Sequence, residues 1–179
     1  MTRVFVSIPV NNARDLEPLV RDLSQVRGVR ITPAYQFHIT LCFIGEIADD
    51  KLETIYQIVD AAVQGVKPGR IDLKGAGCFP NPKRASVVWA GLVSEVPLER
   101  ISVEITSRLK AAGIPFDEKP FKPHITLGRV SGNPDLTVLM NKYRTTEFAT
   151  FVSHNVLVMK SELRPEGAKH TILHASYFD

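Results

Sequence analysis

The chain has 179 residues, of which 44% are hydrophobic and 23% charged, and this length supports a single domain with a sizeable core. No apolar run approaches the roughly 20 residues that a membrane-spanning helix needs. The formal net charge is +3, and the sequence contains no long run of like charges, which argues against a disordered basic arm. Cys42 and Cys78 lie in apolar, strand-like runs and are expected to be buried free thiols, with a disulfide between them as the alternative. We therefore expect a cytoplasmic monomer that does not enter a membrane.

Strand and helix patterns alternate irregularly along the chain. Alternating apolar residues predict a strand over 3–8, and leucines at helical spacing predict a helix over 12–26. Further strands are predicted over 37–44, 70–74, 85–92 and 124–130, helices over 49–63, 97–112 and 133–143, and a hairpin of strands over 155–163 and 170–178. Because strands often follow one another directly, the fold class is α+β with mainly antiparallel sheets flanked by helices.

One tetrapeptide occurs twice. His-Ile-Thr-Leu stands at 38–41 and again at 124–127, and the two copies hold two of the five histidines. In a strand, residues i and i+2 point to the same face, so His38 shares a face with Thr40, and His124 shares one with Thr126. Two related lobes that face each other would bring both motifs to one central cleft. We therefore expect a bilobal, pseudo-two-fold duplication within a single two-lobed domain over residues 1–179.

Two imidazoles and two hydroxyls on one surface suit a phosphodiester substrate. An imidazole with a pKa of about 6.5 serves as base or acid near neutral pH, and hydrolysis needs one of each, on opposite sides of phosphorus. Threonine hydroxyls donate to the non-bridging oxygens. Arg129 would neutralise the charge of the phosphate, but in a regular strand residue 129 points to the face opposite that of His124. It reaches the site only if the strand ends or bends before it.

These residues resemble those of the two-histidine phosphoesterase superfamily, and most closely its RNA 2′,3′-cyclic phosphodiesterase branch, whose members are also called 2′-5′ RNA ligase-like proteins. The resemblance rests on the segments "RVFVSIP", "FHITLCFIGEI", "GAGCFPNPKRASVVWAGL" and "FKPHITLGRV", and so covers nearly the whole chain. Its one mild departure is Gly128, where that branch often has alanine.

The resemblance implies both an activity and individual roles. His38 would be the proton donor to the leaving oxygen and His124 the proton acceptor that activates water, with Thr40, Thr126 and Arg129 binding substrate. It implies no metal and no cofactor. The expected reaction opens the 2′,3′-cyclic phosphate of an RNA 3′ end, or of a small cyclic nucleotide, to a 2′-phosphomonoester. Weak reverse 2′-5′ RNA ligation at the same site is also implied.

Two other kinds of function stay open on sequence. One is a non-catalytic RNA- or nucleotide-binding module that uses the same cleft. The other is a metal-dependent hydrolase, which the sequence disfavours because neither motif carries an adjacent carboxylate or a second histidine. His170 and His174 lie too far apart along one strand to share a metal ion and are interpreted as structural or surface residues. Contacts of Tyr35, Lys83 and Arg84 with substrate are left undecided, while Phe37 and Trp89 are expected in the core.

Overall fold

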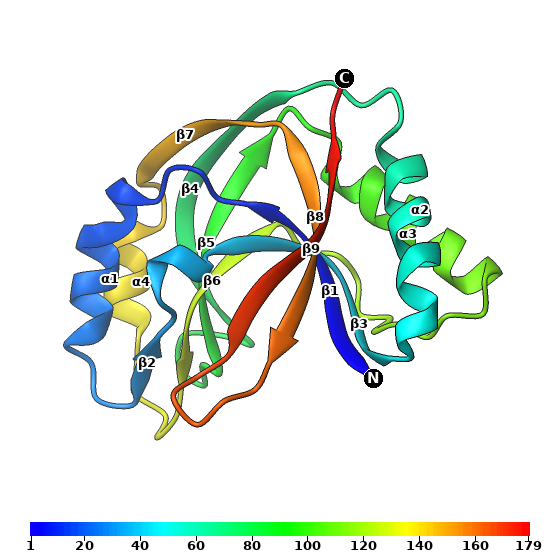
Figure 1. Cartoon of the computed structure of the whole chain (residues 1–179). Coiled ribbons are helices and arrows are strands. Elements are labelled where there is room, and N and C mark those ends of the chain that lie inside the picture. Colours follow the sequence, from blue (N-terminus) through cyan, green and yellow to red (C-terminus); the bar gives the residue numbers. More distant parts are fainter.

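A computed structural model describes all residues 1–179. It contains nine strands and four α-helices, joined in part by short 3-10 segments (Figure 1). In chain order the strands and α-helices are β1 (Thr2–Pro9), α1 (Glu17–Ser24), β2 (Val29–Ile31), β3 (His38–Ile47), α2 (Leu52–Val63), β4 (Gly69–Phe79), β5 (Val87–Ser94), α3 (Leu98–Ala111), β6 (His124–Val130), α4 (Thr137–Tyr143), β7 (Glu147–Ser153), β8 (Asn155–Glu162) and β9 (Lys169–Tyr177).

The strands form one curled antiparallel sheet in the order β7-β4-β5-β6-β3-β1-β8-β9, with β2 paired to β6. Between β6 and β3 the sheet divides into one half of five strands, with β2 beside β6, and one half of four strands. Helices α2 and α3 pack against the half formed by β3, β1, β8 and β9, and α1 and α4 cover the other half (Figure 1). The expected α+β, pseudo-two-fold architecture is confirmed, and each half combines segments that are remote in sequence.

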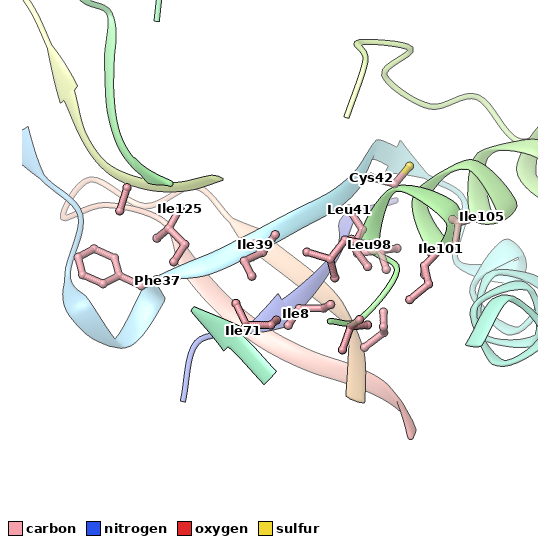
Figure 2. Packing of buried hydrophobic residues seen from close by; sticks show 14 of the residues in the cluster. Ile8, Phe37, Ile39, Leu41, Cys42, Ile71, Leu98, Ile101, Ile105 and Ile125 are labelled. Atoms are coloured by element: carbon pink, nitrogen blue, oxygen red, sulfur yellow. The ribbon is translucent and has the colours of Figure 1, made fainter. Parts of the chain in front are cut away.

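A row of buried side chains crosses the four central strands behind the two motifs. Ile8 lies opposite Ile39, Ile39 opposite Ile125, and Ile125 opposite Ala90, and all four are fully buried. Figure 2 shows Ile8, Ile39 and Ile125 within the surrounding cluster of hydrophobic side chains. The alternation of each strand therefore turns the polar residues of both motifs to the opposite face.

Several predicted boundaries shift. The helix predicted over 12–26 is a 3-10 segment at Arg14–Leu16 followed by α1, with Pro18 in its first turn. The helix predicted over 133–143 begins only at Thr137, and β4 continues to Phe79. Strands β2 and β7 were not predicted. β2 is three residues long, and β7 is held by its pairing with β4, so neither is settled by local pattern.

Both cysteines are free and buried, as predicted. Burial raises the pKa of the Cys42 thiol to about 12 and that of Cys78 to about 11, so both remain protonated and poorly reactive near neutral pH. None of the helices has the length and apolar character required to cross a membrane.

Ile125→Ala should lower the free energy of unfolding by about 2 to 5 kcal/mol, because it leaves a cavity in the centre of the packed row. Urea denaturation followed by circular dichroism measures the change. Ile125→Val removes a single methylene and should cost about 0.5 to 1.5 kcal/mol. Equal losses for both variants would contradict the tight packing of this position.

Candidate active site

The two tetrapeptides lie side by side at the centre of the sheet. The antiparallel register pairs Ile39 of β3 with Ile125 of β6, which sets His38 beside Thr126 and Thr40 beside His124. His38 and His124 are therefore diagonal neighbours on one face, with Cα atoms about 7 to 8 Å apart by the usual geometry of such pairs. The face of the sheet that carries these four side chains is called the motif face below.

Both imidazoles are anchored in the same way. Nδ1 of His38 lies 2.7 Å from the carbonyl oxygen of Gln36, and Nδ1 of His124 lies 2.6 Å from that of Lys122. A carbonyl oxygen only accepts, so each Nδ1 carries a proton and donates it. In the neutral rings Nε2 is consequently the basic atom. Each ring thus presents its proton-accepting atom away from its backbone anchor.

An aromatic side chain of another strand supports each imidazole. The ring of Phe5 in β1 lies 4.9 Å from that of His38, and the ring of Phe79 in β4 meets His124 edge-on at 5.1 Å. Lys122 lies over Phe79, with Nζ 5.1 Å from the ring centroid. Both histidines are half-buried, so their orientation is fixed while the rings remain accessible.

The electrostatic surroundings of the two histidines differ. Burial lowers the pKa of His38 below its usual 6.5, and the nearby imidazoles of His170 and His124 lower it further, against the opposing bond to Gln36. Burial likewise lowers the pKa of His124. There the additional charges are those of Lys122 and Arg129, whereas beside His38 they are those of two other imidazoles.

The two threonines differ in their contacts. Oγ1 of Thr40 lies 3.0 Å from Nε2 of His38, so its hydroxyl donates to the neutral ring. Thr126 is half-buried on the same face, and its hydroxyl makes no hydrogen bond within the protein. A hydroxyl in this position is available to donate to an anionic oxygen.

Arg129 reaches the motif face through a bulge. In the β5–β6 ladder, Val88 pairs with Gly128 but Trp89 pairs with Thr126, so β6 has one extra residue at this point. The extra residue reverses the alternation beyond it. Arg129 is thereby turned to the face of Thr126, which removes the obstacle that strand parity presented.

A third histidine lies beside the motifs, and the sequence pattern did not identify it. His170 of β9 stands 5.7 Å from His38 and 4.9 Å from Phe5, ring centre to ring centre, in edge contacts. Only its position opposite Ser161 of β8 brings it there. His174, by contrast, is structural: its Nε2 lies 2.8 Å from Oδ1 of Asp60.

The remaining candidate residues are dispersed. Tyr35 is 86% exposed just before the first motif, and Lys83 and Arg84 lie exposed in the β4–β5 loop. Phe37 is buried, as expected. Trp89 is only partly buried and lies on the motif face with its ring 5.3 Å from Phe79, so its assignment to the core was wrong.

The motif residues form no cluster of metal ligands and line neither of two surface hollows of the molecule. No group of three or more His, Cys, Asp or Glu side chains is arranged to hold a metal ion. Two surface hollows of about 420 and 550 Å³ lie elsewhere, one beside Asp60 and Ser176 and the other beside Asp72 and Glu147. The motif residues contribute to neither, so the candidate site is the motif face itself.

A curled antiparallel sheet with paired His-x-Thr motifs on neighbouring central strands defines a phosphoesterase of the two-histidine class. The family model described as "LigT like Phosphoesterase" matches residues 6–89 and 91–169. The chain belongs to this LigT-like phosphoesterase family.

Relatives and solved structures agree with this assignment. RNA 2′,3′-cyclic phosphodiesterases of Archaeoglobus fulgidus and Aquifex aeolicus are 33% and 34% identical over 168 and 180 residues, covering 92% and 97% of this chain and 94% and 93% of theirs. The crystal structure of TT0787 of Thermus thermophilus matches with a TM-score of 0.79 at 26% identity, over 98% of this chain and 97% of that one. E. coli LigT complexed with 3′-AMP shares the fold, with a TM-score of 0.74 at 21% identity over 99% and 98% of the two chains.

Proposed function

We propose that the protein hydrolyses RNA 2′,3′-cyclic phosphates to 2′-phosphomonoesters by paired acid–base catalysis. The observation that supports this most directly is the pair of imidazoles, His38 and His124, held diagonally on one face with both Nδ1 atoms bound to backbone carbonyls. The curated relatives at 33% and 34% identity carry the same activity in their names.

In the proposed reaction His124 acts as the base and His38 as the acid. Nε2 of His124 takes a proton from water as the water oxygen bonds to phosphorus. The bond from phosphorus to the 3′ oxygen breaks, and protonated His38 gives its proton to that oxygen. The product carries a 2′-phosphate and a 3′-hydroxyl, and exchange of one proton with solvent restores the starting state.

The two roles are those that the two-histidine family implies, and the different charges around the two rings support them. Lys122 and Arg129 keep a positive field at His124, which favours the neutral, proton-accepting imidazole. The charges that act on His38 are those of imidazoles, and a bound phosphodiester anion would raise its pKa and so favour the protonated ring that the acid role needs. Thr40 and Thr126 would donate to the non-bridging oxygens, and Arg129 would neutralise the developing charge.

We also propose that the reaction needs no metal, because the two imidazoles carry out both proton transfers, one from water and one to the leaving oxygen. The same geometry would support weak reverse 2′-5′ ligation by microscopic reversibility. We infer further that the chain works as a monomer, in the form of a single two-lobed domain, in the cytoplasm. One contiguous cluster of 40 buried residues and two buried free thiols favour this view.

The test is incubation with an oligoribonucleotide that ends in a 2′,3′-cyclic phosphate, with a chelator present. We expect conversion to a 2′-phosphate end, identified by chromatography against 2′- and 3′-phosphate standards. Binding without turnover would favour the non-catalytic module instead. Activity that disappears in chelator and returns with a divalent ion would favour the metal-dependent hydrolase.

A further inference from the structure

Two arginines of the motif face lie directly opposite each other without a counterion. Arg30 of β2 pairs with Arg129 of β6 in the antiparallel register. Both side chains are exposed, and neither guanidinium makes a hydrogen bond or an ion pair in the structure. Like charges at directly opposite positions destabilise a sheet. This pair therefore reduces stability in the free protein and would be relieved by an anion.

Arg30 lies on the side of the motif face where β3 begins at His38, whereas the charge of Arg129 acts on His124. Thr126 stands beside His38 in the register, and Arg129 follows it along β6. Beyond the pair, Nη2 of Arg30 reaches the turn between β8 and β9, where a Cβ built on Gly167 would lie 3.8 Å from it. Arg30 thus continues the surface on the side of the proposed acid.

The same turn is connected to the anchor of His38. Nε2 of Gln36 donates to the carbonyl oxygen of Ala168 at 2.5 Å, while the carbonyl oxygen of Gln36 accepts from Nδ1 of His38. Lys169, directly after Ala168, is exposed and unpaired, whereas the neighbouring Arg164 is paired with Glu162. Free positive charge at this end therefore comes from Arg30 and Lys169.

We propose that Arg30 binds the RNA backbone phosphate upstream of the cyclic end, while Arg129 serves the cyclic phosphate itself, so that the preferred substrate is an RNA chain rather than a cyclic mononucleotide. This inference rests on the proposed function. In the proposed reaction the leaving 3′ oxygen belongs to the terminal ribose and meets His38. The rest of the RNA strand extends from that ribose, and Arg30 lies on the same side. Guanidinium groups match phosphate oxygens in shape and charge.

The kinetic test compares two substrates with the same terminal base. One is the nucleoside 2′,3′-cyclic monophosphate, and the other is an oligoribonucleotide with the same cyclic end. Arg30→Gln should lower kcat/KM for the oligoribonucleotide by about tenfold, the loss expected for one charge-assisted phosphate contact, and leave the mononucleotide unchanged. Arg100→Gln is the matched control, because Arg100 is exposed on α3, unpaired, and changes the net charge equally. An equal loss on both substrates, or no loss on either, overturns the proposal.

A binding measurement separates this inference from the catalytic one. Fluorescence anisotropy with a labelled oligoribonucleotide ending in a 2′-phosphate needs no turnover. Arg30→Gln should weaken binding about tenfold and reduce the slope of log K against log salt by about 0.7, the value for one phosphate of a single strand. If the wild type binds this RNA but opens no cyclic phosphate, the proposed function fails while the RNA contact stands. If a polyglutamate peptide displaces the labelled RNA as well as unlabelled RNA does, the site binds any polyanion, and the proposed contact with an RNA phosphate is overturned.

The melting temperature distinguishes an RNA-binding role of Arg30 from a structural one, because the two roles predict shifts of opposite sign. Removal of one of two opposed charges should raise the melting temperature of Arg30→Gln by about 1 to 3 °C in the absence of RNA. Added RNA should stabilise the wild type more than the variant. A lower melting temperature for the variant would assign Arg30 to the fold and overturn the proposal.

Discussion

His38→Ala and His124→Ala should each lower kcat by about 10² to 10⁴-fold, with folding intact, because each removes one of the two proton transfers. Both side chains are only half-buried, and the core behind them is formed by other residues. The measurement is initial-rate kinetics on a cyclic-phosphate RNA, alongside thermal melts. His154→Ala is the matched control: His154 is exposed and should retain full activity.

A substrate with a different leaving group distinguishes the two roles. A p-nitrophenyl phosphodiester releases an anion that departs without a proton, so it makes little demand on the acid. His38→Ala should then lose much less activity on this ester than on RNA, whereas His124→Ala should lose about the same on both. The double variant should be no worse than the poorer single variant, since the two groups act as a unit. Reversed losses would exchange the two roles.

The pH dependence should be bell-shaped for both kinetic constants, with the bell for kcat at higher pH. The base must be neutral, so activity falls about tenfold per pH unit below the pKa of His124. The acid must be protonated, so activity falls in the same way above the pKa of His38. In the free protein burial and neighbouring charges hold both values below 6.5, which places the limbs of kcat/KM on the acidic side.

Bound substrate should shift both limbs of the pH profile to higher pH. The phosphodiester anion favours the charged form of both imidazoles and so raises both pKa values in the complex, which kcat reports. Lys122→Gln should move the acidic limb of the profile to higher pH, because it removes a positive charge that lowers the pKa of His124. The profiles of kcat and kcat/KM measured on one substrate provide the comparison. Coincident profiles would contradict the electrostatic account.

The asymmetry between the halves matters more than their similarity. Both halves deliver an imidazole on a rigid strand with the same backbone anchor, yet hydrolysis needs one acid and one base. The pseudo-two-fold arrangement supplies the opposed positions. The charged neighbours differ, with His170 on one side and Lys122 with Arg129 on the other, so the two rings have different electrostatic surroundings.

The sequence by itself determined which side chains share a face, because alternation along a strand is a property of the local backbone. His38 with Thr40, and His124 with Thr126, could be grouped on this ground, and so could Ile39 and Ile125 behind them. The repeat of one motif also indicated that the two copies act together.

The tertiary structure alone decided what meets across strands, because pairing between segments remote in sequence depends on the packing of the whole sheet. The register of Ile39 with Ile125 made the two histidines neighbours. A one-residue bulge in β6 turned Arg129 to the motif face. The short strand β2 placed Arg30 opposite it, and β9 placed His170 against His38. None of these contacts has a local signal, since each partner comes from a different part of the chain.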